Sequence, residues 1–200
     1  AIGGHSTVSG GLSSCAIGCV ATLGGGACNV VGGTYSTIAG GCTNTSTKDF
    51  AVIAGGFNNL ASGLSSFIGS GHHNCATGAG SVIGGGDTNT ASGAGASVLG
   101  GISNVGSNTC VSIGGGSNNQ ASGPIDTVAG GYYNLANGGC AFVGGGSNNR
   151  ATADYSTVVG GLSTCAEQNY GFVGGGFDNC TTAYYSAVVG GGRNTASGLS

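Results

Sequence analysis

Hydrophobic and polar positions recur every 15 residues along this 200-residue chain, without insertion or deletion. We number the positions of the unit from 1 to 15, with Ala1 at position 1. Position 8 is aliphatic in all thirteen units, position 14 is Asn in eleven, and position 1 is mostly Ala. A Gly pair at positions 10 and 11 is interrupted only by Ser70. One short unit repeated in strict register is typical of a solenoid.

Each unit predicts two short strands and no helix, because the Gly-rich corners leave no stretch of about ten residues without a helix breaker. Positions 6 to 9, rich in Val, Ile, Thr and Phe, predict the first strand, and positions 14 to 2 predict the second. The Gly pair supplies the positive φ of the corner between them. The predicted fold is an all-β parallel β-solenoid, or β-roll, with about 13 coils of 15 residues, in one domain over residues 1–200.

Side chains alternate across a strand, which divides the positions into an inner and an outer set. Positions 6, 8, 14 and 1 are expected to face a thin core, and positions 7, 9, 15 and 2 to face outward. The large apolar core residues predicted at position 8 are Val8, Leu23, Ile38, Ile53, Ile68, Ile83, Val98, Ile113, Val128, Val143, Val158, Val173 and Val188.

Equivalent residues of adjacent coils lie about 4.8 Å apart in such a stack, so each position forms a ladder. The Asn residues at position 14 are expected either to hydrogen-bond their amides to one another or to tolerate a corner conformation. The unbroken run of this ladder is Asn29, Asn44, Asn59, Asn74, Asn89, Asn104, Asn119, Asn134 and Asn149. Tyr155, Tyr170 and Tyr185 share position 5 in consecutive coils and predict a stack of rings.

The two outer faces differ in composition. Positions 7 and 9 contain no charged residue in 26 places, and a large residue at one of them accompanies a small residue at the other. Such volume matching is expected of a packed contact, so the first strand is predicted to have protein on both sides. Positions 15 and 2 carry Gln120, Arg150 and Glu167 and predict a wet surface. The predicted inter-chain contact residues are Phe67, Phe142 and Phe172.

Of the nine cysteines, Cys165 and Cys180 share one position in adjacent coils, at a separation that permits a disulfide. They are the candidate disulfide pair. No C-x-x-C spacing occurs, so the sequence predicts no zinc site. The remaining cysteines are expected to be small apolar filler or an interchain thiol, and disulfides suit an extracellular location.

Charged residues make up only 4% of the chain, and the net charge is −3, which argues against nucleic-acid binding. No apolar run of 18 residues exists, so membrane insertion is not expected. The two acidic residues that share a position, Asp49 and Asp154, are seven coils apart, which argues against a catalytic carboxylate pair. We therefore expect neither enzymatic activity nor a cofactor.

Two motifs recur along the chain. The first is S-T-V-V-G-G at residues 156–161 and S-V-I-G-G-G at residues 81–86. The second, N-x-A-S-G, follows the first within the repeat and is complete at residues 89–93 and 194–198. These motifs resemble the head repeats of YadA-like trimeric autotransporter adhesins. The resemblance covers nearly the whole chain and implies a left-handed parallel β-roll, three copies of which pack with the first strand inside.

The sequence favours a non-enzymatic structural protein, a subunit of an extracellular β-solenoid filament or surface fibre. Both ends of the chain lie in mid-pattern without polar caps, so end-to-end stacking is expected in addition to lateral self-association. A trimeric surface adhesin head is the alternative. An ice-binding solenoid is a third reading, based on Thr7, Thr22 and Thr37. Each reading places the chain outside the cell or on a cell or particle surface.

Overall fold

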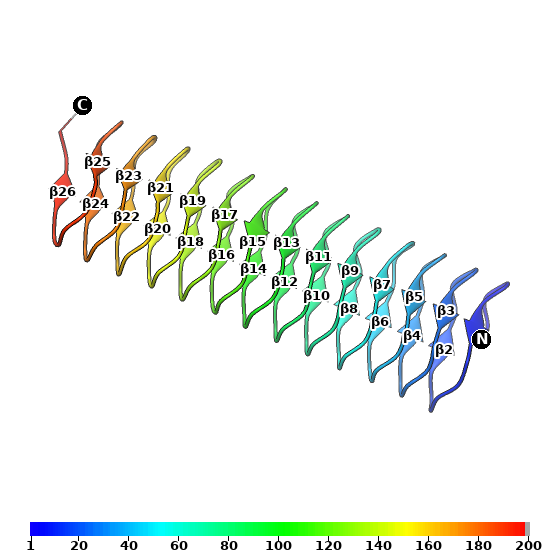
Figure 1. Cartoon of the computed structure of the whole chain (residues 1–200). Coiled ribbons are helices and arrows are strands. Elements are labelled where there is room, and N and C mark those ends of the chain that lie inside the picture. Colours follow the sequence, from blue (N-terminus) through cyan, green and yellow to red (C-terminus); the bar gives the residue numbers. More distant parts are fainter. Residues whose placement is uncertain (199–200) are drawn as a thin grey trace. The chain divides into compact units, whose positions relative to one another are not determined.

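The chain is an all-β parallel β-solenoid of 15-residue coils, each with two short strands, in a computed structural model that describes residues 1–198 (Figure 1). The predicted fold class is confirmed. The described residues contain no helix. The chain divides into two compact units, residues 1–101 and residues 102–200, and each unit is described by itself. The single domain over residues 1–200 stays a prediction.

In the first unit, two parallel sheets are built from alternate strands, and each strand pairs in register with its equivalent one coil further on. One sheet uses positions 7 and 8: β1 (Thr7–Val8), β3 (Thr22–Leu23), β5 (Thr37–Ile38), β7 (Val52–Ile53), β9 (Phe67–Ile68), β11 (Val82–Ile83) and β13 (Ser97–Val98). The other uses positions 15 and 1: β2 (Cys15–Ala16), β4 (Val30–Val31), β6 (Thr45–Ser46), β8 (Leu60–Ala61), β10 (Cys75–Ala76) and β12 (Thr90–Ala91).

The second unit repeats this arrangement. Positions 15 and 1 form β14 (Val105–Gly106), β16 (Gln120–Ala121), β18 (Leu135–Ala136), β20 (Arg150–Ala151), β22 (Cys165–Ala166), β24 (Cys180–Thr181) and β26 (Thr195–Ala196). Positions 7 and 8 form β15 (Ser112–Ile113), β17 (Thr127–Val128), β19 (Phe142–Val143), β21 (Thr157–Val158), β23 (Phe172–Val173) and β25 (Ala187–Val188).

The core is a thin layer of one large aliphatic side chain per coil packed with small residues. Position 8 is fully buried from Leu23 to Val173, whereas Val8 is half-buried and Val188 is 8% exposed. Positions 6, 14 and 1 supply mostly Ser, Ala and Asn to the same interior. A third line of single-residue parallel bridges runs at position 12 in each unit, beginning with Leu12 to Ala27 in the first. The sequence pattern did not predict this third line.

The strands are only two residues long because the backbone reverses direction at positions 5 and 13. Residues there have positive φ even when they are not glycine, including Val20 (55°) and Ile125 (62°). Strand N–H groups donate to the following coil, but the N–H of Val20 donates to the preceding coil, to Gly4 O at 2.8 Å. The left-handed conformation turns the N–H backward, so both neighbouring coils supply partners to the corner backbone.

The Asn residues at position 14 form hydrogen bonds with the backbone of the corner at positions 10 to 14. The side-chain oxygen of Asn119 accepts the backbone N–H of Asn134 at 3.0 Å. Its amide nitrogen donates to the carbonyls of Gly115 (2.9 Å) and Gly131 (2.8 Å). Its own N–H donates to the side-chain oxygen of Asn104 at 2.9 Å. The fully buried Asn119 side chain therefore joins two coils, and the backbone N–H of the same residue links them to a third.

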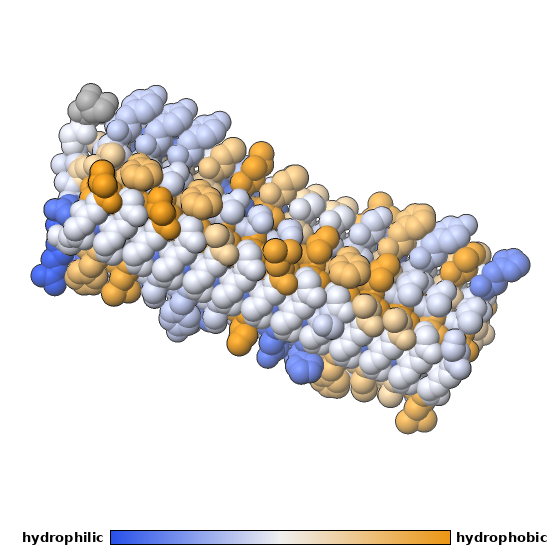
Figure 2. Space-filling view, in the orientation of Figure 1, coloured by the Kyte–Doolittle hydropathy of each residue, from blue (hydrophilic) through white to orange (hydrophobic). Residues whose placement is uncertain are grey.

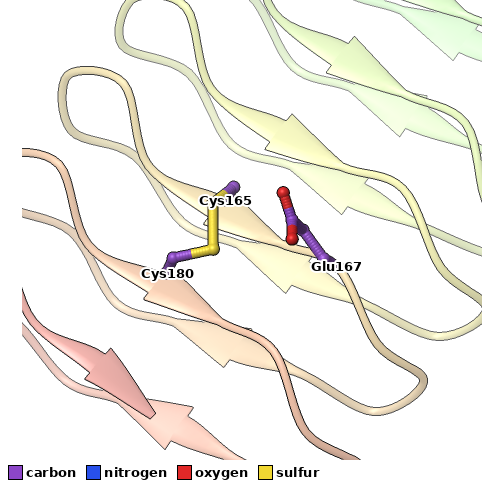
Figure 3. Close-up of side chains that lie close together, drawn as sticks. All are labelled: Cys165, Glu167 and Cys180. Carbon is purple, nitrogen blue, oxygen red and sulfur yellow. A yellow bond between two sulfur atoms is a disulfide. The ribbon is translucent and has the colours of Figure 1, made fainter. Parts of the chain in front are cut away.

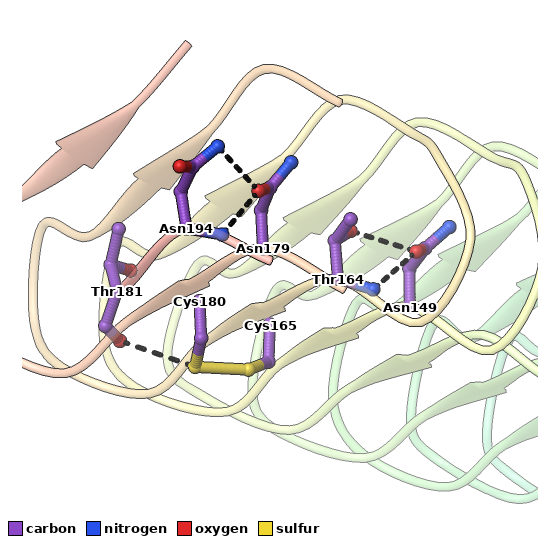
Figure 4. The surroundings of a disulfide bond; sticks show 7 residues. All are labelled: Asn149, Thr164, Cys165, Asn179, Cys180, Thr181 and Asn194. Atoms are coloured by element: carbon purple, nitrogen blue, oxygen red, sulfur yellow. Dashed lines mark hydrogen bonds between the residues drawn. A yellow bond between two sulfur atoms is a disulfide. The ribbon is translucent and has the colours of Figure 1, made fainter. Parts of the chain in front are cut away.

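This bonding differs from the expected amide-to-amide ladder, since most of it runs from side chain to backbone. A direct amide contact joins Asn59 to Asn44 at 3.1 Å. A second joins Asn194 to Asn179, also at 3.1 Å (Figure 4). Thr164 replaces Asn in one coil, and its hydroxyl donates to Asn149 Oδ1 at 2.7 Å. The corner-conformation alternative applies to position 13, which carries the positive φ, rather than to position 14.

The second glycine of each pair is required by its positive φ and by the close approach of the next coil, and the Asn amide adds a further contact where Asn is present. Gly116 has φ of 86°, a conformation that an L side chain rarely adopts. A Cβ atom there would lie only 2.7 Å from Asn119 Nδ2 and would also collide with the Gly131 carbonyl oxygen. Positions 11 and 14 therefore depend on each other.

Aromatic rings stack along position 5. The ring centroids of Tyr155 and Tyr170 are 5.1 Å apart, and those of Tyr170 and Tyr185 are 4.8 Å apart, with planes within 7° of parallel. The predicted tyrosine stack is confirmed. Tyr35 and Phe50 form an equivalent stack at 5.4 Å in the first unit.

Replacing Asn119 by Ala should lower the free energy of unfolding by about 3 kcal/mol, because the buried N–H of Asn134 and the carbonyl of Gly115 lose their partner. Chemical denaturation of the full chain measures the change. Asn137→Ala is the matched control, since Asn137 is exposed and should cost less than about 1 kcal/mol. Equal losses for the two variants would contradict the role assigned to position 14.

Replacing Ile125 by Asn should raise the free energy of unfolding by about 1 kcal/mol, because a β-branched residue is strained at positive φ and Asn is tolerated there. The side chain is 59% exposed, so little burial is lost. Ile102→Asn is the control, with 54% exposure and no positive φ. It should not stabilise the protein; stabilisation of both variants, or of neither, would show that φ is not the cause.

Candidate assembly surface

The outward face of the odd-numbered strands, made by positions 7 and 9, is the candidate site, and we call it the strand-one face. Its three phenylalanines are only partly covered: Phe67 is 39% exposed, and Phe142 and Phe172 are each 37% exposed. Larger residues at position 9 are exposed more, with Leu99 at 60% and Val159 at 49%. Apolar side chains therefore face solvent in a single chain.

The rings of Phe67 and Phe142 lean along their own strands. A Cβ atom on Gly144 would lie 3.2 Å from Cε1 of Phe142, and one on Gly69 would lie 3.6 Å from Cε1 of Phe67. The ring thus occupies the space that a side chain at position 9 would fill. The volume matching between positions 7 and 9 has a cause inside one strand, and a second chain is not needed to explain it.

Charge is distributed unevenly between the two outer faces. The strand-one face has no ionisable side chain, whereas Gln120, Arg150 and Glu167 are all exposed on the face of the even-numbered strands. Figure 2 shows one side of the surface, where apolar residues lie among near-neutral ones and strongly hydrophilic residues gather at few points. The strand-one face can be covered without removing a charge from water.

The sequence-predicted cysteine pair lies on β22 and β24. A disulfide joins Cys165 to Cys180, whose Cα atoms are 4.6 Å apart (Figure 4). The other seven cysteines carry free thiols. Burial raises the pKa of the Cys75 thiol, which lowers its thiolate fraction and its reactivity.

The sequence pattern did not indicate that one carboxyl group, that of Asp126, is buried. Asp126 is fully buried at position 6 and accepts backbone N–H groups from Gly123 (2.7 Å) and Ala141 (2.8 Å). Burial raises its pKa above the usual value, and the nearby charge of Asp154 acts in the same direction. Ser156, at the same position in another coil, instead donates its hydroxyl to the Ala153 carbonyl at 2.6 Å.

The acidic residues at position 4 have structural roles. Asp49 accepts the N–H of Thr34, and Asp154 accepts the N–H of Gly139, both at 2.8 Å. The described residues form no ligand-sized cavity. They also contain no helix long and apolar enough to cross a lipid bilayer.

No protein-family model matches this chain, and no curated protein has a significantly similar sequence. Of what the resemblance to YadA-like head repeats implies, the structure shows the parallel β-solenoid architecture.

Acidification should stabilise the wild-type protein relative to Asp126→Ser. The folded-state pKa of Asp126 is raised, so the folded chain binds the proton more tightly than the unfolded chain does. The resulting stability is fully present below the unfolded pKa of about 3.9 and is lost as the pH rises through the folded pKa. Melting temperatures of both proteins between pH 3 and 7 measure the difference, which should move toward the wild type at low pH. A constant difference would contradict the assignment.

Proposed function

We propose that this chain is a non-enzymatic structural subunit that associates laterally through its strand-one face, within an extracellular filament or surface fibre. The observation that carries the proposal is that the strand-one face is partly apolar and has no charged residue in 26 places, whereas the face of the even-numbered strands carries Arg150 and Glu167.

Lateral packing suits this face for two physical reasons. Sheets pack face to face at about 10 Å when their side chains are apolar and of even height, and the Phe rings lying over Gly69 and Gly144 even out the height. Covering the face also buries Leu99 and Val159 without desolvating an ion. A second copy of the chain carries a surface of the same chemistry, so we propose that the strand-one face packs against the strand-one face of another copy.

An extracellular location is consistent with the Cys165–Cys180 disulfide, since disulfides persist in oxidising surroundings. The adhesin-head alternative uses the same face, because three β-rolls with their first strands inside form a closed trimer. It differs from a fibre in having a fixed stoichiometry of three.

The ice-binding alternative needs a long, regular array of threonines. Thr7, Thr22 and Thr37 are aligned in register, but Val52 and Phe67 follow them in the same sheet. Three threonines form too short an array to favour this function.

The assembly test is Phe142→Glu, which places a charge on the strand-one face. Sedimentation velocity and electron microscopy of the wild type should show particles much larger than the 18.6 kDa chain, and Phe142→Glu should shift the material to the single-chain species. Gln120→Glu is the control, because it adds the same charge to the exposed face of β16.

Open-ended fibres support the filament, and a fixed species of three chains supports the adhesin head. A wild type that sediments as one chain at high concentration would overturn lateral assembly. Loss of assembly in Gln120→Glu alone would move the interface to the even-numbered strands.

A further inference from the structure

Three metal-binding side chains converge on the outer face of β22 and β24. Cys165 and Cys180 are in-register partners on adjacent parallel strands. Glu167 follows Cys165 by two residues and therefore points to the same side of the chain (Figure 3). The two sulfur atoms and a carboxylate oxygen all lie within 4.8 Å of one another. This is the one group of at least three such ligands among residues 1–198.

The group is open to ions from solvent. Glu167 is exposed, and both cysteines are half-buried. The 15-residue spacing identified the cysteine pair, but it did not identify Glu167 as a third ligand, because Glu167 occupies a different position of the unit. In a C-x-x-C site a tight turn places two sulfur ligands side by side, and here the 15-residue repeat places them side by side on adjacent strands.

The spacing of the strands fits tetrahedral thiolate coordination. Zinc–sulfur bonds of about 2.3 Å at tetrahedral angles require sulfur atoms about 3.8 Å apart. Cα atoms 4.6 Å apart on parallel strands permit that separation once the S–S bond is absent. A carboxylate oxygen supplies a third ligand at about 2.0–2.2 Å, and solvent reaches the fourth position.

We propose that reduction of the Cys165–Cys180 disulfide creates a binding site for one Zn²⁺ or Cd²⁺ ion, held by both sulfur atoms, the Glu167 carboxylate and a water molecule. A dithiol reductant supplies two electrons and two protons, which break the S–S bond and form two thiols, and the dithiol leaves as a disulfide. The metal then replaces one proton on each thiol, so binding releases two protons.

Charge and ligand type define the ion. Two thiolates and one carboxylate carry −3, so a divalent ion leaves −1, and Arg150 is the in-register neighbour of Cys165 on β20. Sulfur ligands favour Zn²⁺ and Cd²⁺ over Mg²⁺ and Ca²⁺, which prefer oxygen. Cys75 is on the same face of its sheet, but its in-register neighbours are Leu60 and Thr90, so it lacks a second sulfur.

The test uses the full chain, reduced with a dithiol that is then removed under inert gas, and CdCl₂ as the only added metal. Equilibrium dialysis should show one more tightly bound Cd²⁺ in the reduced wild type than in Cys180→Thr, with a stronger thiolate-to-cadmium absorption band. Thr is native at this position in β12 and β26, so the fold should accept it. Cys75→Ser should keep the extra ion.

Two further measurements isolate the ligands. Oxidised wild type should lack the extra ion, a comparison that needs no substitution. Glu167→Gln should weaken Cd²⁺ binding at least tenfold while retaining the thiolate band. Equal binding by reduced wild type and Cys180→Thr, or by reduced and oxidised wild type, would overturn the site, and unchanged affinity in Glu167→Gln would overturn the three-ligand geometry.

Discussion

The architecture depends on satisfying the backbone at corners where strand hydrogen bonding cannot continue. At one corner the Asn side chains of position 14 do this. Asn119, for example, accepts an N–H from the next coil and donates to two glycine carbonyls. A buried N–H without a partner costs about 1–3 kcal/mol, and every coil contains this corner. The glycine at position 11 is fixed at the same corner, because a side chain on Gly116 would collide with the Gly131 backbone and with the Asn119 amide.

The opposite corner has no Asn ladder, and its position 5 shares the positive φ that position 13 has at the first corner. Position 5 is occupied by Val20, Ile125 and the stacked tyrosines, all at positive φ. A non-glycine residue in this conformation costs roughly 1 kcal/mol or more. Ring stacking, as between Tyr170 and Tyr185, offsets part of that cost because the 15-residue repeat sets rings at contact distance. Stacking of coils therefore both imposes and compensates the strained conformation.

The features that could be predicted from the sequence are those that depend on periodic interactions. The fold class and the tyrosine stack were predictable because they depend on one residue type recurring at one position. The side-chain-to-backbone bonding of the Asn residues was not, because the pattern identifies the position and not the atoms that bond. The cluster of Cys165, Glu167 and Cys180 combines two positions of the unit, so it appears only when strand register is known. The cause of the Phe and Gly matching likewise required the ring orientation at Phe142.

A thin core explains why the outer faces carry the functional argument. With one large aliphatic residue per coil, the interior of residues 1–198 forms no ligand-sized cavity, and the sites open to chemistry are the two strand faces and the corners. The even-numbered strands place polar and charged residues, together with the disulfide, in contact with water. The outward face of the odd-numbered strands is uncharged and partly exposed to solvent. Because positions 7 and 9 are uncharged in every coil, a contact made by one coil can be repeated by its neighbours, and individually weak apolar contacts then sum along the stack.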